Sequence, residues 1–289
     1  MRLSEFIDQV PELGKAQFVE ERDFDYFARN PSQCKGRICV YASQKRYCRT
    51  IPNNTTMVIT TADLASRFGN DAPYGLCIVD DPKVAFFRAF IAWVDRIKDA
   101  GNLTEIGSSC SIADSAKIAK RGVRIGNDVV IEAGVIICEN VTIGNGCTIR
   151  SGAKIGMQDF NYFTVDGERT RLPHAGGVVI GNDVEVGLGS FIGAALYPQN
   201  ATTVGDRCII GMNCAIGHDD FIEKEVMIYS NSILGGFVNV GEGSSVYLSA
   251  TVKNGISIGR NARVGMGSCV LRDIPDHTTV FGNPARAIQ

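Results

Sequence analysis

A period of six residues runs from about residue 101 to the end of the chain, and it constrains the fold more than any other feature. An Ile, Val or Leu recurs at every sixth position, with one step of seven from Ile118 to Ile125, and Gly often follows it. The residue four positions later is usually small: Ser, Thr, Ala, Val or Cys. The series is Ile106, Ile112, Ile118, Ile125, Ile131, Ile137, Ile143, Ile149, Ile155, then Ile180, Val186, Ile192, then Val204 and every sixth residue to Val270.

This period fits neither an α-helix nor a long alternating strand. It fits very short strands joined by Gly, Asn or Asp turns, with three strands in each 18-residue coil of a prism. Each apolar residue then stacks on its counterpart in the next coil, about 4.8 Å away. The predicted fold class is mainly β: a left-handed parallel β-helix of hexapeptide repeats over residues 101–275, an exception to the right-handed crossover rule.

Two insertions interrupt the repeat, at residues 156–179 and 193–203. Loops that leave a rigid scaffold often carry function, so both are candidate parts of a site. Solvent-exposed decoration is the other interpretation.

The first hundred residues have a different texture. Residues 37–42, 55–60 and 74–80 are apolar and predict buried strands. Residues 81–99 predict a helix with Asp81 as N-cap and Pro82 at its first position. Trp93 and the neighbouring Phe residues have the spacing of a packed helix face. We expect a small α/β domain over 1–100, ahead of the β-helix and of a C-terminal tail at 276–289.

Composition excludes several classes of protein. The net charge is −2 and no Lys/Arg run is long, which argues against nucleic acid and anionic membranes as partners. No apolar stretch reaches the ~18–20 residues of a membrane span, and the N-terminus lacks a secretory apolar segment. A cytoplasmic protein is therefore expected. Four of the ten cysteines fall at the small position of the repeat, so packing rather than disulfides or metal is predicted. They are Cys110, Cys147, Cys208 and Cys214.

Several motifs resemble known families. "VYASQKRY", "TTMVIT", "IVDDPKVAF", "DFNY" and the β-helix together resemble the N-acyltransferases of lipid A biosynthesis, which acylate a UDP-acyl-glucosamine. "GHDDFI" and "GMGSCVLRDIPDHTTVFGNPARAI" are similar to bacterial acetyltransferases that act on nucleotide-linked amino sugars. Asp219 follows the histidine as in the acetyltransferases. The chain also stops at "GNPARAIQ", without the helical extension by which the lipid A enzymes engage acyl carrier protein.

The resemblance implies an N-acyltransferase. It would move an acyl group, most simply acetyl, from acyl-CoA to the amine of a UDP- or dTDP-linked amino sugar in bacterial surface glycan synthesis, such as that of the O-antigen of lipopolysaccharide. It implies a homotrimer, and no permanently bound cofactor or metal. The alternatives are an acyl-carrier-protein-dependent N-acyltransferase of lipid A biosynthesis, and a non-catalytic β-helix scaffold or binding subunit. A zinc site is disfavoured, because the three histidines are 44 and 59 residues apart, neither a multiple of eighteen.

The catalytic prediction centres on His218, at a corner of the coil where it need not be buried inside the prism. A neutral imidazole could remove the proton of an attacking amine. Gly236 lies eighteen residues on, one coil above, and its N–H could stabilise the oxyanion. Asp219 could fix the tautomer of His218, or could be an ordinary turn aspartate.

Further residues are predicted to bind the acceptor or the donor. By resemblance, Tyr41 and Tyr47 would stack on the nucleotide base beside Gln44, although both tyrosines could simply pack. His174 in the first insertion could contact substrate, whereas His277 is expected at the surface. The remaining acceptor-binding candidates are Phe160, Tyr162 and Asn213. The predicted donor-binding residues are Gly235, Gly236, Asn254 and Arg272 in one column, with Asn283 and Arg286 in the tail.

Overall fold

The computed structural model describes residues 1–28, 36–69, 72–97, 101–165 and 167–288. The chain forms two compact units. Unit 1 comprises Met1–Lys98 and Asn161–Pro173, and unit 2 comprises Asp99–Phe160 and His174–Gln289. The predicted domain boundary at residue 100 and the end of the predicted helix at residue 99 lie outside the described residues.

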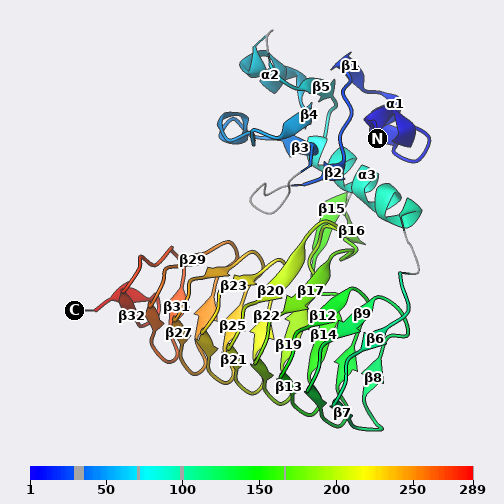
Figure 1. The fold of residues 1–289 in the computed structure, drawn as a ribbon. Coiled ribbons are helices and arrows are strands. Elements are labelled where there is room, and N and C mark those ends of the chain that lie inside the picture. The colour runs from blue at the N-terminus through cyan, green and yellow to red at the C-terminus, as the bar shows by residue number, and fades with distance from the viewer. Residues whose placement is uncertain (29–35, 70–71, 98–100, 166, 289) are drawn as a thin grey trace. The chain divides into compact units, whose positions relative to one another are not determined.

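Unit 1 is built on a five-stranded sheet with the order β1-β5-β4-β3-β2 (Figure 1). Strands β2 to β5 run parallel and β1 pairs antiparallel with β5. The three predicted buried strands correspond to β3, β4 and β5. The strands are β1 Gln17–Glu20, β2 Tyr26–Phe27, β3 Ile38–Ala42, β4 Thr55–Thr60 and β5 Gly75–Ile78. Short helices are η1 Leu3–Phe6, α1 Pro11–Gly14, η3 Tyr47–Arg49, α2 Ala62–Ala65 and η4 Ser66–Phe68.

The long helix α3 (Pro82–Arg96) begins as predicted. The side chain of Asp81 accepts hydrogen bonds from the N–H groups of Lys83 and Val84, both at 3.0 Å, and Pro82 occupies the first position. Phe86 and Trp93 are buried, with ring centroids 5.3 and 5.7 Å from that of Phe27. The aromatic residues of this helix are therefore core, as predicted.

The middle of the first insertion is not an irregular loop. It forms an antiparallel hairpin, β15 (Tyr162–Val165) with β16 (Glu168–Arg171). The ring centroid of Phe163 on β15 lies 5.3 Å from that of Phe87 on α3. Apolar contact with α3 explains why this part of the insertion belongs to unit 1.

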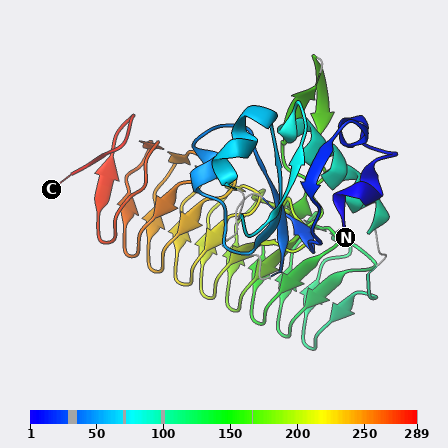
Figure 2. The ribbon, with the colours of Figure 1, turned by 90° about the horizontal axis from the view of Figure 1, so that it is seen from above.

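Unit 2 is the predicted left-handed β-helix, in which three sheets, parallel except for the antiparallel last strand β33, form the faces of a prism (Figures 1 and 2). Sheet I holds β7 Ser111–Ile112, β10 Val130–Ile131, β13 Thr148–Ile149, β18 Glu185–Val186, β21 Ile209–Ile210, β24 Met227–Ile228, β27 Ser245–Val246, β30 Arg263–Val264, β32 Thr279–Phe281 and β33 Arg286–Ala287. Sheet II holds β8 Lys117–Ile118, β11 Ile136–Ile137, β14 Lys154–Met157, β19 Phe191–Gly193, β22 Ala215–Ile216, β25 Ile233–Leu234, β28 Thr251–Val252 and β31 Cys269–Val270. Sheet III holds β6 Glu105–Ile106, β9 Val123–Ile125, β12 Val141–Ile143, β17 Gly177–Ile180, β20 Ala201–Val204, β23 Phe221–Ile222, β26 Asn239–Val240 and β29 Ser257–Ile258.

The hexapeptide period sets the register of these sheets. Ile216 on β22 pairs with Ile192 below it and with Leu234 above it, and all three side chains are buried. Cys147, Cys208 and Cys214 are buried beside this apolar column, as predicted for small hydrophobic residues. Burial raises the pKa of the Cys208 thiol to about 11. Strand β32 continues sheet I, so the coil extends into the segment expected as a tail.

The corner between sheets III and I explains the Gly-Asn-Asp turns of the sequence. The N–H of Asn127 donates to Asn145 Oδ1 at 2.8 Å, that of Asn145 to Asn182 Oδ1 at 2.9 Å, and that of Asn182 to Asp206 Oδ1 at 2.7 Å. Asp183 has a φ of 55°, in the left-handed region that Asn and Asp tolerate. We call this series of side-chain bonds between coils the amide ladder.

The corner between sheets II and III is where the repeat is broken. The first insertion connects β14 to β17 and the second connects β19 to β20, both from sheet II to sheet III. In the next coil the same corner carries residues 217–220, between β22 and β23. Both insertions and His218 therefore belong to one edge of the prism.

Candidate active site

His218 lies at corner II/III, as the period predicts, but only 6% of its surface is exposed. Its ring centroid is 5.1 Å from that of His174 and 4.9 Å from that of Phe237, which meets it edge-on at 89°. The structure places His218 at the corner between β22 and β23. The imidazole is nevertheless buried, because side chains from the first insertion and the next coil cover it.

Gly236 lies one coil above His218, in the predicted register. Ala215 pairs with Ile233, and the N–H of Phe237 donates to the carbonyl of His218 at 2.9 Å. A Cβ atom on Gly236 would lie 2.6 Å from His218 Nε2, so a side chain here would displace the ring. Glycine is therefore required for this close approach. The neighbouring N–H of Gly235 donates to Val252, whereas the N–H of Gly236 donates to no acceptor within the described residues.

Asp219 contacts His218 directly. Its Oδ2 lies 3.1 Å from His218 Nδ1, and 1% of the Asp219 side chain is exposed. Because a carboxylate accepts, this contact places the proton of a neutral imidazole on Nδ1 and leaves a lone pair on Nε2. Asp219 also has a φ of 59°, as a turn aspartate would. The same residue can therefore serve the turn and contact His218.

The second insertion surrounds Asp219. The N–H of Leu196 donates to Asp219 Oδ2 at 2.7 Å and Asn200 Nδ2 donates to Asp219 Oδ1 at 2.9 Å. The N–H of Asp219 donates to Thr202 Oγ1 at 2.9 Å. Sequence reasoning flagged this insertion as a whole but identified none of these residues.

The first insertion supplies a second contact to His218. Asp159 Oδ2 lies 3.4 Å from the backbone N of His218, and the N–H of Asp159 donates to His174 Nδ1 at 3.2 Å. His174 is thus held next to the candidate base, as expected of a residue at the site. Asp159 was missed, although it lies in the "DFNY" motif that carries the resemblance.

Asp220, the next residue after Asp219, is a fully buried carboxyl in the same turn. It accepts from the N–H of Gly217 at 2.9 Å and from that of Val238 at 2.8 Å, and so connects the turn of His218 to that of Gly236. Burial raises its pKa well above the usual value. The sequence signal was the charge itself, since most other repeats place Ser, Cys, Ala or Val at this position and the remaining ones carry no charge there.

The predicted donor column exists as a structural series. Asn254 and Arg272 occupy the places equivalent to Gly236 in the next two coils and are exposed. The Cβ position of Gly235 lies 2.8 Å from Asn254 Oδ1. In the tail, Cys269 on β31 donates to Gly282 O and accepts from the N–H of Ala285. The exposed residues Asn283 and Arg286 therefore belong to a segment along the strand that precedes Arg272.

The acceptor residues predicted from sequence are more dispersed. Asn213 lies in the turn between β21 and β22, at corner I/II rather than the corner of His218. Its φ is 51°, and its N–H donates to Leu188 O at 2.9 Å. Phe160 is 85% exposed in unit 2, and Tyr162 begins β15 in unit 1. His277 is exposed, as expected.

Tyr41 and Tyr47 line one cavity in unit 1, together with Val40, Thr50, Ile51 and Pro52. Gln44, which lies between these two tyrosines in the sequence, is exposed. The ring centroid of Tyr41 is 5.1 Å from that of Phe86, so Tyr41 also packs on the core. A cavity with two tyrosines can hold a flat ring.

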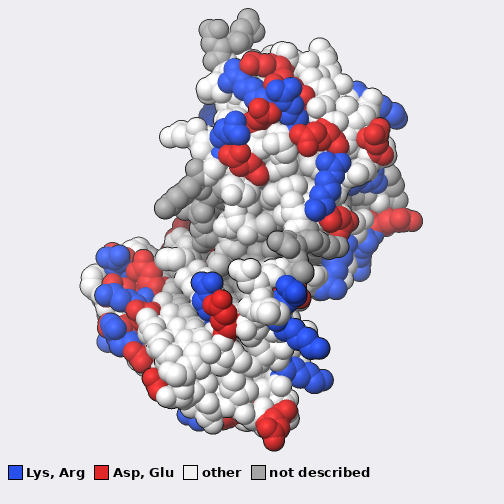
Figure 3. Space-filling view, turned by 45° about the vertical axis from the view of Figure 1, so that its right-hand side comes forward, with Lys and Arg blue, Asp and Glu red and all other residues white. Residues whose placement is uncertain are grey.

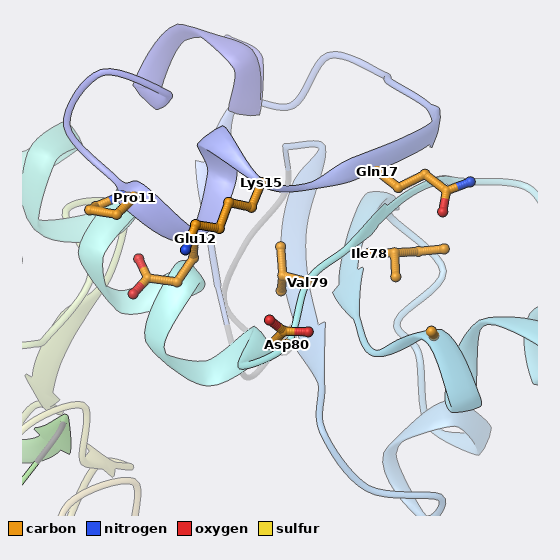
Figure 4. A pocket seen from close by; sticks show the side chains of 8 residues that line it. Pro11, Glu12, Lys15, Gln17, Ile78, Val79 and Asp80 are labelled. Carbon is orange, nitrogen blue, oxygen red and sulfur yellow. The ribbon is translucent and has the colours of Figure 1, made fainter.

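A larger hollow in unit 1 lies between α1 and the end of β5, with Glu12, Lys15 and Asp80 at its edge (Figure 4). It contains none of the predicted site residues. In the view of Figure 3, Lys/Arg and Asp/Glu side chains gather in clusters of both signs, with broad uncharged areas between the clusters. The described part of the chain holds no group of three His, Cys, Asp or Glu side chains placed to bind a metal ion. Nor does it contain a helix long and apolar enough to cross a membrane.

Two segments of the chain match families of hexapeptide-repeat proteins. Residues 122–156 match the bacterial transferase hexapeptide family, and residues 238–272 match the hexapeptide repeat of succinyl-transferase. The chain is 34% identical over 121 residues to the acyl-(acyl-carrier-protein)–UDP-N-acetylglucosamine O-acyltransferase of Stutzerimonas stutzeri, covering 42% of this chain and 45% of that protein. It thus spans about half the length of the curated relatives it matches.

Solved structures support the fold. The UDP-N-acetylglucosamine acyltransferase of Francisella novicida is 25% identical with a TM-score of 0.52, over 64% of this chain and 67% of that one. The UDP-N-acetylglucosamine acyltransferase of Campylobacter jejuni is 23% identical with a TM-score of 0.58, over 66% of this chain and 73% of that one.

Proposed function

We propose that this hexapeptide-repeat protein is an acyltransferase that moves an acyl group from a thioester to a nucleotide-linked sugar, with His218 as general base. The observation that carries the proposal is the arrangement at corner II/III. Asp219 holds the Nδ1 side of His218 while Nε2 faces Gly236 in the next coil. A non-catalytic scaffold has no need for a buried His–Asp pair. Nor does it need the glycine at 236, whose lack of a side chain makes room for the imidazole.

The chemistry follows from these groups. Nε2 of neutral His218 takes the proton of the attacking hydroxyl or amine as the acceptor forms its bond to the thioester carbonyl. The N–H of Gly236 stabilises the oxyanion of the tetrahedral intermediate. Collapse of the intermediate breaks the carbon–sulfur bond, and the proton on His218 passes to the leaving thiolate. The acyl donor is a co-substrate, and no resident cofactor takes part.

The names of the relatives favour acyl carrier protein as the donor and UDP-N-acetylglucosamine as the acceptor, acylated on oxygen. We adopt these as the first substrates to test. Acetyl-CoA with a UDP- or dTDP-linked amino sugar is the second pair, because "GHDDFI" and the tail along β31 favour it. Tyr41 and Tyr47 are the proposed binding site of the nucleotide base, with Gln44 beside them.

We also propose a homotrimer. Supporting it, corner I/II exposes apolar side chains in four of five successive coils, the remaining coil carrying Ser230 at this place: Leu188 at 49%, Met212 at 54%, Leu248 at 44% and Met266 at 60%. A second copy of the chain would cover such a row. Sedimentation equilibrium would give three times the chain mass, and a monomer would contradict this part of the proposal.

The function is tested by thiol release from acyl-carrier-protein thioesters and acetyl-CoA, each against UDP-N-acetylglucosamine and the amino sugars, with the product analysed by mass spectrometry. The proposal is supported if one pair is turned over, if His218→Ala abolishes this turnover, and if Tyr41→Ala raises the KM for the nucleotide-linked sugar. A folded protein that turns over none of the pairs would leave the scaffold interpretation.

A further inference from the structure

The second insertion is built into the site rather than lying on the surface. Ala194, Ala195, Leu196 and Tyr197 are each at most 4% exposed. The N–H of Ala194 donates to Met157 O at 3.0 Å, and that of Gly177 donates to Asn200 O at 3.0 Å. These bonds tie the insertion to both ends of the first one. Solvent-exposed decoration does not describe it.

The buried part of this insertion donates hydrogen bonds to the carboxylate of Asp219. Asp219 Oδ2 accepts from the backbone N–H of Leu196 and from His218 Nδ1, while Oδ1 accepts from Asn200 Nδ2. Asn200 is 8% exposed. It is the one side-chain donor to Asp219 from outside the His218 turn among the described residues. Because Nδ2 only donates, Asn200 requires Oδ1 of Asp219 to act as an acceptor, as the N–H of Leu196 requires of Oδ2.

We infer that Asn200 is a positioning residue that fixes the orientation of Asp219, and through it the tautomer of His218. The inference rests on the proposed function of His218 as base. The terminal torsion of an aspartate is soft, so two donors on one oxygen and one on the other are needed to hold it. Held in this way, Asp219 keeps the proton on Nδ1 and the lone pair of Nε2 toward Gly236.

Other charged or titratable groups around the imidazole must be considered in any pH test. His174 and Asp159 approach from the first insertion, Asp219 and Asp220 come from the same turn, and the next coil contributes uncharged Gly236 and Phe237. None of these groups changes in an Asn200 variant. A change seen in Asn200→Ala, which introduces no charge, therefore reports on the loss of the bond from Asn200 to Asp219.

Asn200→Asp is the sharpest test, because it has the same shape but a carboxyl in place of the donor. The new carboxyl can donate to Asp219 only when the pair holds one proton, and two adjacent carboxyls raise one pKa strongly. Wild-type kcat should stay level as the pH rises above neutrality. In Asn200→Asp, kcat should fall at higher pH, when the pair loses the shared proton. Asn200→Ala should lower kcat by about tenfold or more at every pH, with KM little changed.

The matched control is Asn239→Asp, which places the same charge at an exposed position on sheet III in the next coil. It should keep the wild-type profile. A wild-type profile in folded Asn200→Asp and Asn200→Ala would overturn the inference.

A second measurement does not depend on turnover. The chain has three histidines, so ¹⁵N imidazole NMR with a His218→Gln variant identifies the signals of His218. The wild type should show the neutral Nδ1–H tautomer, and Asn200→Ala a mixture of tautomers. An unchanged tautomer in Asn200→Ala would refute the positioning role even if no substrate is found. Wild-type protein that turns over nothing would instead refute the proposed function.

Discussion

Corners III/I and II/III of the same β-helix differ in the side chains that their turns carry. At corner III/I the amide ladder repeats from coil to coil through Asn145, Asn182 and Asp206, and each side chain satisfies the backbone of its neighbour. At corner II/III the ladder is absent from the described coils, both insertions emerge, and His218 and Asp219 occupy a turn. The backbone register is the same at both corners. The difference lies in which side chains the turns carry.

The comparison shows how a repetitive scaffold accommodates chemistry. The regular corner fixes the spacing of the coils, so the irregular corner can bury carboxyl groups without shifting the strands. Asp219 and Asp220 are buried at corner II/III, and each is satisfied by N–H groups from neighbouring segments. Changes at the two corners should therefore have separable effects on activity and stability.

The largest expected effect is that of His218→Ala. Loss of the general base should lower kcat by about 10²–10⁴-fold with little change in thermal unfolding. Steady-state thiol release and differential scanning calorimetry measure the two quantities. Activity at the wild-type level in this variant would show that corner II/III is not the catalytic corner.

Gly236→Ala should come next. The new Cβ would lie 2.6 Å from His218 Nε2 and must displace the base, so kcat should fall by about 10²-fold in folded protein. Gly211→Ala is the matched variant at corner I/II, where the Cβ would meet the backbone N of Ser230 at 2.5 Å. That variant should lose stability while its folded fraction keeps the wild-type kcat. Equal kcat losses in both variants would contradict the separation of the corners.

Asn182→Ala breaks the amide ladder at two contacts, since its side chain accepts from Asn145 and donates to Asp206. Loss of these partly exposed bonds should lower the free energy of unfolding by about 1–2 kcal/mol. The kcat should not change. Urea unfolding and the same thiol assay check this, and a kcat loss without a stability loss would invert the roles of the two corners.

The smallest expected effect is the pH dependence of Asp220→Ser. Burial raises the folded-state pKa of Asp220 above its unfolded value, so the folded state binds the proton more tightly. Stability from this group is therefore full below the unfolded pKa and is lost as the pH rises through the folded pKa. Relative to wild type, Asp220→Ser should gain about 1 kcal/mol or more between pH 4 and pH 8. Urea unfolding at several pH values measures the gain, and a difference constant with pH would contradict it.

The sequence predicts the periodic part of this molecule in detail. Apolar residues six apart are enough to set strands, coils and register, so the eighteen-residue step from His218 to Gly236 could be counted directly. The same counting places Asn213 at a different corner, because five residues before His218 is about one third of a coil. That displacement was available from the sequence but was not used.

The insertions could not be predicted in the same way. Their sequences lack the period, so no register links Asn200 to Asp219 or Asp159 to His218. These contacts depend on how two non-repetitive segments fold against each other at one corner. The burial of His218 follows from them, which is why the sequence indicated a corner position but not an enclosed base.

Equivalent residues along corner II/III are separated by a whole number of coils. His218, Gly236, Asn254 and Arg272 occupy equivalent places in four successive coils, so Arg272 lies about 14 Å along the axis from the base at about 4.8 Å per coil. Removal of residues 237–254 would bring Arg272 one coil nearer and leave Gly236 above His218. A chain of this architecture can thus lengthen or shorten its reach in fixed steps of eighteen residues while its chemistry stays the same.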